Sequence, residues 1–205
     1  MSGWTLILGH AAQQDLWRMQ WSRDVEVGAV ILGRHECSGI NRYDTGRHVF
    51  VRRIIHADRN ATDESVDVDY DSVFAMQTLP SRGHARTDSA GSGRTGSDDP
   101  GLILGNLHSH PEQVREMSDT DIRAAAWNAA NAPDALQGKP SVVILATATD
   151  EWLDGNLVES WANPTLDPFL VFGDRRVVKP TIYAQSEVEW NCEEAQRVLL
   201  AGGVL

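Results

Sequence analysis

The segment 106–121, NLHSHPEQVREMSDTD, constrains the fold of this 205-residue chain more than any other feature of its sequence. Residues two apart on a β-strand point to the same face, so His108 and His110 at a strand end can direct both imidazoles to one point. Ser118 fits the N-cap of the alanine-rich helix that follows, which places Asp121 in the first helical turn. A chain with this segment has to bring the end of a strand and the start of a helix together.

His108, His110 and Asp121 make a donor set that suits a catalytic zinc ion. Three protein ligands leave one position open for a water molecule, whose pKa the metal lowers toward about 7. Each piece alone has an ordinary explanation, because a strand-end histidine is usually just polar and S-x-x-D is usually a plain capping box. The whole string, with seven residues between His110 and Ser118, is what favours a metal site.

Charge and cysteine content narrow the classes of function. A net charge of −11, from 18 basic and 29 acidic residues, disfavours nucleic-acid binding, which needs basic surface to neutralise phosphate. No apolar run approaches the roughly 20 residues of a membrane span, and no basic region precedes the short apolar stretch at the N-terminus. Two cysteines exclude a cysteine-built zinc site and are typical of free thiols in a reducing compartment. We therefore expect a cytoplasmic protein without membrane or nucleic-acid partners.

Hydrophobic periodicity predicts an α/β or α+β domain in which strands are mixed with a few helices. Strands are predicted over 5–8, 25–32, 49–55, 66–70, 102–108 and 141–147, with less regular ones over 152–161 and 175–183. Helices are predicted over 11–21, 71–79, 119–131 and 186–200. Ser186 and Glu189 fit a capping box for the last helix, and Gly202 fits its end.

Residues 80–101 differ in composition from the rest of the chain. They are rich in Gly, Ser, Asp and Arg and have no hydrophobic face to bury, which predicts a flexible insertion before the strand that bears the histidines. A loop this long inside a domain is either functional or a tolerated surface insertion, and composition leaves both open.

The string H-S-H-x7-S-x-x-D resembles the signature of the JAMM family, also called JAB or MPN+ metalloproteases. The upstream family motif E-x-G-x-x-x-x-G is matched by residues 26–33, EVGAVILG, and the resemblance covers roughly residues 5–161. It implies an α/β fold, a single JAB1/MPN-type domain with a curved central mixed sheet flanked by helices. On this basis we expect the metalloprotease domain over 1–163, with 80–101 as its flexible insertion, and a C-terminal extension over 164–205 that ends in a helix.

The resemblance also implies a role for each motif residue. His108, His110 and Asp121 would be the zinc ligands. Glu26 would hydrogen-bond the zinc-bound water, take its proton as general base and pass it to the leaving amine. Ser118 would help to stabilise the oxyanion. Since an N-cap uses the hydroxyl oxygen as acceptor, we expect the Ser118 hydrogen to stay free for that task.

The activity implied by the resemblance is zinc-dependent hydrolysis of the peptide or isopeptide bond after the C-terminal Gly-Gly of a ubiquitin-like protein. This would be deconjugation or precursor processing in a bacterial ubiquitination-like or antiphage pathway, with E1- and E2-like proteins as partners and 80–101 helping to hold the substrate tail. Processing of a sulfur-carrier protein, such as cysteine release, is one alternative. A non-catalytic MPN-like interaction module is another. A DNA-repair-associated relative is disfavoured by the acidic charge and by the single proline, Pro111, after the second histidine.

Overall fold

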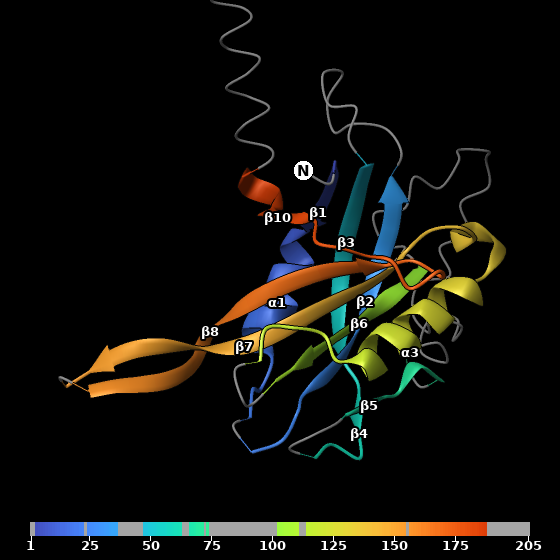
Figure 1. Ribbon diagram of the computed structural model, residues 1–205. Helices are drawn as coiled ribbons and strands as arrows, with labels where there is room; N and C mark the ends of the chain where they lie inside the picture. Colours follow the sequence, from blue (N-terminus) through green and yellow to red (C-terminus); the bar gives the residue numbers. More distant parts are fainter. Residues whose placement is uncertain are drawn as a thin grey trace, which may run out of the picture.

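The central feature of the molecule is a mixed eight-stranded sheet (Figure 1), seen in a computed structural model. The structure describes residues 3–22, 24–36, 47–62, 66–71, 73, 102–110, 114–154 and 156–187. In chain order the elements are β1 (Trp4–Leu8), α1 (His10–Arg18), β2 (Gly28–Glu36), β3 (Arg47–His56), β4 (Asp58–Arg59), β5 (Asp67–Val68), β6 (Leu102–Ser109), α3 (Asp119–Ala130), the 3-10 helix η1 (Asp134–Leu136), β7 (Ser141–Leu153), β8 (Asn156–Val171), β9 (Val177–Val178) and β10 (Thr181–Ala184).

The strands follow the order β10-β1-β3-β2-β6-β7-β8-β9, and β4 pairs with β5 in a separate two-stranded sheet. Pairing is parallel for β10–β1, β1–β3 and β6–β7 and antiparallel for the other neighbours in the large sheet. The prediction of an α/β domain with a curved mixed sheet flanked by helices is therefore confirmed. The predicted insertion over 80–101 lies outside the described residues.

The two faces of the sheet are covered by different helices. Along β7, Val142 and Ile144 belong to the apolar cluster that contains Ala12 of α1. Val143 and Leu145 belong to the cluster that contains Ala125 of α3. Because side chains alternate between faces along a strand, α1 and α3 lie on opposite sides of the sheet. Within the described residues, no helix combines the length and the apolar character that crossing a membrane requires.

Two predicted strands are wrong in their extent. The predicted strand over 152–161 is a hairpin, because β7 ends at Leu153, which pairs with Asn156 at the start of β8. Asp154 has a φ of 51° at the reversal, and the hairpin extends beyond the rest of the sheet (Figure 1). The predicted strand over 175–183 is split, because β9 pairs with β8 whereas β10 pairs with β1. Pro180 lies between the two pieces and has no N–H for a ladder hydrogen bond.

The predicted helix and strand over 66–79 also need correction. Only Asp67–Val68 forms a strand, and Tyr70 is already helical, so the alternation of apolar and acidic residues did not mark a longer strand. The helix predicted over 71–79 is described only at its start, and residues 74–79 lie outside the described part.

Helix ends depart from prediction at both termini. α1 ends at Arg18 rather than at residue 21, and the residue after it, Met19, is extended. The last helix begins at Gln185, because the Ala184 N–H donates to Glu187 Oε2 at 2.6 Å. The predicted capping box is therefore wrong at Ser186, and its partner Glu189 and the predicted stop at Gly202 lie outside the described residues. The predicted domain boundary at residue 163 falls inside β8, and β9 and β10 extend the same sheet.

Gly105 allows β6 to lie close to β7 just before the histidines. The β2–β6 register shifts here, since Ile31 pairs with Gly105 and Leu32 pairs with Ile103. A Cβ atom on Gly105 would lie 1.9 Å from the Val142 carbonyl oxygen. Since that oxygen belongs to backbone, a side chain at position 105 would push the strand that carries the histidines away from its neighbour.

We predict that Gly105→Ala lowers the free energy of unfolding by about 1–3 kcal/mol, the usual cost of overpacking a fitted site. Urea denaturation of the purified variant measures the change. Gly3→Ala is the matched control, because a Cβ at Gly3 meets nothing within 4 Å. Equal stability of the two variants would contradict the close approach of β6 and β7.

Candidate metal centre

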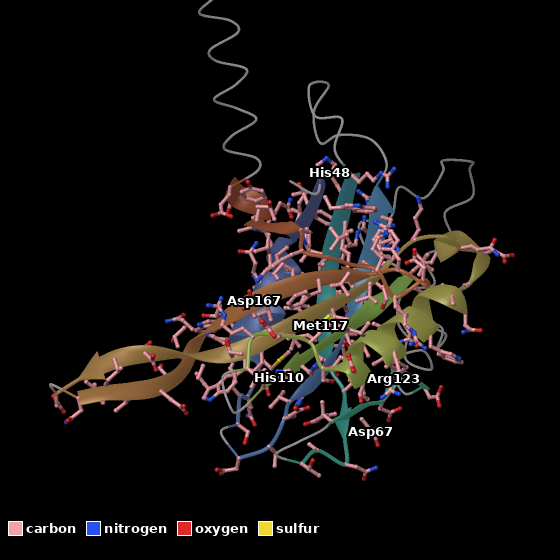
Figure 2. All side chains as sticks on the ribbon, viewed as in Figure 1. His48, Asp67, His110, Met117, Arg123 and Asp167 are labelled. Carbon is pink, nitrogen blue, oxygen red and sulfur yellow. The ribbon has the colours of Figure 1, made fainter. Side chains whose placement is uncertain are left out.

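The structure brings together the three side chains that the sequence singled out as ligands. One ligating atom from each of His108, His110 and Asp121 lies within 4.8 Å of the others. The two imidazole rings are adjacent, with centroids 5.1 Å apart. Figure 2 labels His110 at the end of β6 and Met117 just before α3, and the centre lies where these two elements approach each other. The predicted meeting of a strand end and a helix start is confirmed.

His108 supplies a buried nitrogen suited to a metal. The residue lies on β6 and is 5% exposed. It faces α3, because its neighbour Leu107 packs in the cluster that contains Ala12 of α1 and side chains alternate along a strand. Its Nε2 is 3.5 Å from Asp121 Oδ1 and has no hydrogen-bond partner among the described residues. A buried polar atom without a partner is costly, and coordination of a cation would remove that cost. The donor set therefore fits a divalent metal ion with nitrogen and oxygen ligands.

His110 is held in one tautomer by the chain that follows it. Its Nδ1 lies 2.7 Å from the Val114 carbonyl oxygen. A carbonyl oxygen only accepts, so Nδ1 carries the hydrogen and Nε2 keeps its lone pair. Burial and the charge of His108 lower the pKa of His110, outweighing the Val114 carbonyl and Asp121, which raise it. The neutral imidazole, the form that binds metals, is therefore favoured.

Asp121 is oriented by the N-cap of α3. Its Oδ2 accepts the Ser118 N–H at 2.9 Å and the Ser118 hydroxyl at 2.7 Å, and the Asp121 N–H donates to Ser118 Oγ. The other carboxylate oxygen, Oδ1, faces His108. Burial raises the pKa of Asp121, but the adjacent His108 imidazole and the hydrogen bonds from Ser118 outweigh it and hold the pKa well below its ordinary value. The carboxylate is therefore ionised at neutral pH.

The capping box uses the Ser118 hydroxyl differently from the prediction. The hydroxyl oxygen accepts from the Asp121 N–H, as expected for an N-cap. Its hydrogen, however, is donated to Asp121 Oδ2 instead of staying free. The expectation of a free hydroxyl hydrogen is wrong for this state, because the carboxylate three residues along is the nearest strong acceptor.

Glu26 lies beside the ligands at the entry to β2. The predicted strand over 25–32 begins later, at Gly28, which pairs with His108. Glu26 is 8% exposed, and its backbone N–H donates to the Thr62 carbonyl at 2.6 Å. Burial raises the pKa of Glu26 to about 7, with His108 lowering it and Asp121 raising it. The pairing of Gly28 with His108 and the hydrogen bonds between Val27 and Ser109 place Glu26 close to the predicted ligands.

Ser109, the middle residue of H-S-H, has a positioning role that sequence reasoning did not assign. It is fully buried, its hydroxyl accepts the Val27 N–H at 2.8 Å, and its own N–H donates to the Val27 carbonyl at 2.9 Å. These bonds fix the residue after Glu26 to the strand that bears the histidines. The available signal was a serine two residues after Leu107 on a strand predicted to be buried, since a buried hydroxyl needs a partner.

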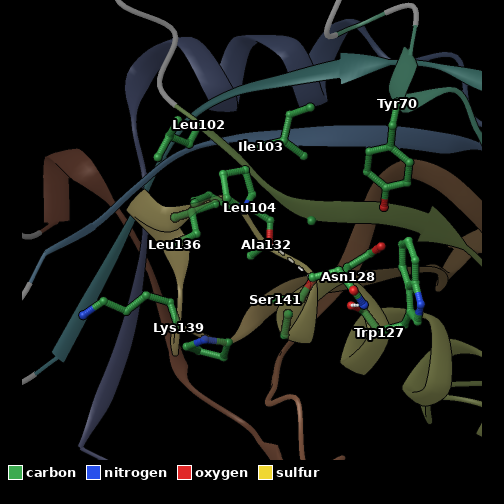
Figure 3. Close-up of a pocket in the computed structure, with 15 residues that line it drawn as sticks. Tyr70, Leu102, Ile103, Leu104, Trp127, Asn128, Ala132, Leu136, Lys139 and Ser141 are labelled. Atoms are coloured by element: carbon green, nitrogen blue, oxygen red, sulfur yellow. Dashed lines mark hydrogen bonds between the residues drawn. The ribbon is translucent and has the colours of Figure 1, made fainter.

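Two hollows lie beside β6 and α3, the elements that carry the metal ligands. An acidic groove of about 520 Å³ is lined by Asp67, Asp69 and Asp71, and its walls include Asn106 and Ala124, which lie two residues before His108 and three after Asp121. A mostly apolar cavity of about 250 Å³ lies farther along β6 and α3 (Figure 3). Tyr70 and Lys139 are the titratable residues among those that line this cavity. The residues suited to acid–base chemistry gather at the metal centre and not in the apolar cavity.

Comparison with known proteins gives one clear result. The family model described as prokaryotic homologs of the JAB domain matches residues 11–162. The matched span contains Glu26, His108, His110, Ser118 and Asp121. A search of curated proteins finds no match.

We predict that zinc stabilises the chelator-treated protein through Asp121. A ligand present at 100 times its Kd and specific for the folded state adds about 2.7 kcal/mol, which raises the Tm in a thermal-shift measurement. Asp121→Asn should lose most of this shift. Asp119→Asn is the control, because Asp119 lies in the same helical turn but is exposed. A full zinc shift in Asp121→Asn would argue against the proposed ligand set.

We predict that the metal-free protein loses stability as pH rises, because the pKa of Glu26 is raised in the folded state. Its pKa is raised from 4.5 to about 7, so the folded state binds this proton more tightly than the unfolded chain does. Its contribution to stability is therefore favourable at low pH and declines as pH rises from about 4.5 to about 7. Glu26→Gln should be more stable than wild type by about 1–3 kcal/mol above pH 7, with the gap closing toward pH 4.5. Denaturation in chelator across this range tests it, and a gap independent of pH would contradict the raised pKa.

Proposed function

The chain belongs to the family of prokaryotic homologs of the JAB domain, and from this membership and the geometry of its metal centre we propose that it is a zinc-dependent peptidase. The observation that carries the proposal is the convergence of His108, His110 and Asp121 beside a buried Glu26. The family includes metalloproteases, and the donor set is compatible with a metal ion, so both observations support a hydrolase.

Zinc is the metal that this donor set favours. Two imidazoles and one carboxylate, with a fourth position open, are typical of catalytic zinc sites, whereas calcium and magnesium prefer oxygen ligands alone. When bound, the ion would supply a Lewis acid for the substrate carbonyl and lower the pKa of water. His108 Nε2, His110 Nε2 and Asp121 Oδ1 are the atoms left available to hold it.

Glu26 is suited to move the proton that amide hydrolysis requires. Its carboxylate would accept a proton from the attacking water and deliver it to the leaving nitrogen, which is a poor leaving group unless protonated. A pKa of about 7, caused mainly by burial, lets one carboxyl act as base and then as acid near neutral pH. A bound cation would lower this pKa, because an opposite charge favours the carboxylate.

Ser118 would serve the oxyanion only after a local exchange of hydrogen bonds. Its hydroxyl hydrogen has to turn away from Asp121 Oδ2 to reach a substrate oxygen. Asp121 Oδ2 keeps the Ser118 backbone N–H as a donor, so the carboxylate retains its orientation during the exchange. A hydroxyl that donates to developing charge stabilises the transition state more than the substrate.

The substrate we propose is a ubiquitin-like protein, cut at the peptide or isopeptide bond after its C-terminal Gly-Gly. The supporting features are the family membership and the groove beside the metal centre, which lies between residues 66–71 and α3 and would offer a path for an extended chain. Conjugate removal or precursor processing would place the protein beside E1- and E2-like partners, in a cytoplasmic ubiquitination-like or antiphage pathway.

Two other functions are distinguished by specific features. Sulfur-carrier processing with cysteine release would use the same residues on another substrate, so only the substrate differs. A non-catalytic interaction module is disfavoured by Glu26. Burying a carboxyl group destabilises the fold, and binding a partner through a surface does not require such a group. Detectable hydrolysis therefore distinguishes an enzyme from an interaction module. The substrate that is cleaved distinguishes processing of a ubiquitin-like protein from processing of a sulfur carrier.

The test uses zinc-loaded protein and a panel of ubiquitin-like and sulfur-carrier fusions with a peptide or cysteine after Gly-Gly. Wild type should release the C-terminal group, and Glu26→Gln should lower kcat by about 10²–10⁴-fold with its zinc content unchanged. Glu151→Gln, an exposed residue on β7, is the control and should match wild type. A zinc-loaded wild type that cleaves none of the fusions would count against the peptidase proposal.

A further inference from the structure

Asp167 is a buried carboxylate outside the family-matched span that contacts the chain around the metal centre. It lies on β8 and is 3% exposed. One oxygen accepts a hydrogen bond from Arg115 Nε at 2.7 Å, and the other accepts from Lys179 Nζ. Burial raises the pKa of Asp167, but Arg115 and Lys179 outweigh it and lower the pKa. The residue is therefore an ionised group with a cation on each oxygen.

Arg115 belongs to the segment 114–118, which directly precedes α3. In this segment the Val114 carbonyl accepts from His110 Nδ1, and Ser118 caps the helix that carries Asp121. Met117 packs against the apolar cluster beneath α3. Arg115 joins the segment to β8 through charge-assisted hydrogen bonding, 52 residues away in the sequence. The segment therefore has an apolar anchor and an ionic anchor, with contacts to the metal ligands on either side.

We propose that Asp167 is a positioning residue of the metal centre. By holding Arg115 it fixes the adjacent Val114 carbonyl, and that carbonyl keeps the hydrogen of His110 on Nδ1 so that Nε2 is free for the metal. Groups that hold a ligating histidine typically contribute 10–100-fold to metal affinity, because they remove the cost of ordering the ligand. Asp167 acts one contact farther out, through backbone that Arg115 fixes.

Lys179 connects this arrangement to the last two strands of the sheet. It lies between β9 and β10 and shares Asp167 with Arg115. A buried charge left with a single partner is more costly than one with two, so Lys179 allows Asp167 to stay ionised next to Arg115. The metal centre therefore depends on residues at 167 and 179, beyond the match that ends at residue 162. The inference rests on the metal-binding part of the proposed function and not on peptidase activity.

The experiment measures zinc affinity of the full chain by competition with a chromophoric chelator. Asp167→Asn and Arg115→Gln should each bind zinc about 10–100-fold more weakly than wild type. Their cobalt-loaded forms should show altered visible absorption, which reports coordination directly. Asp174→Asn is the matched control, because that exposed carboxylate pairs with Arg176 at 3.9 Å, away from the segment. It should bind zinc as wild type does.

The outcomes separate this inference from the peptidase proposal. Wild-type affinity and cobalt spectra in both Asp167→Asn and Arg115→Gln would overturn it. If Asp167→Asn loses its native circular dichroism, the zinc affinity of Arg115→Gln tests the inference. In that variant Asp167 is retained and keeps Lys179 as its partner. The inference would also be overturned if Lys179→Met bound zinc more weakly while Arg115→Gln bound zinc as wild type does. The loss of affinity would then not depend on Arg115. A zinc-binding wild type without peptidase activity would refute the enzyme and leave the positioning role intact.

Discussion

The attachment of the end of β6 to its two neighbours is the constraint on which the metal centre depends. Ser109 exchanges two hydrogen bonds with Val27 on one side, and the His110 N–H donates to the Ala146 carbonyl on the other. These bonds hold the histidines at a fixed height against Glu26, which precedes Val27 directly. Because β6 and β7 are parallel, the chain between them has to cross over, and α3 is part of that crossover connection. Ligand geometry follows from ladder hydrogen bonds, which are short-ranged and directional, rather than from flexible side-chain contacts.

Two carboxyl groups at this centre have opposite electrostatic behaviour, and the cause is local. Asp121 receives two donors from Ser118 and faces His108, so its charged form is stabilised although it is partly buried. For Glu26, burial is the largest effect and raises the pKa to about 7. A ligand has to stay ionised, whereas a proton carrier has to change state near neutral pH. Two carboxyl groups can therefore take different roles in one site, because their environments shift their pKa values in opposite directions.

The sequence predicted those parts of the site that local geometry determines. The alternation of strand side chains put His108 and His110 on one face, and the capping box put Asp121 in the first turn of α3. Long-range pairing was not predictable in the same way. Nothing near residue 181 indicates that β10 pairs with β1, and the Asp-Gly sequence at 154–155, a known hairpin signal, was missed between β7 and β8. Sequence patterns report neighbours along the chain, whereas sheet order is decided by contacts between distant segments.

The region after residue 162 shows why a family match and a structural unit need not end together. β8 continues across that position, and β9 and β10 form the two edges of the sheet. Closing the loop between Arg115 and Asp167 costs entropy that grows only slowly with its length. The sheet already holds β8 in place for other reasons, so the remaining cost of forming this ion pair is small. A distant carboxylate on a rigid strand can therefore hold the segment 114–118 in place better than a nearby residue on a loop could.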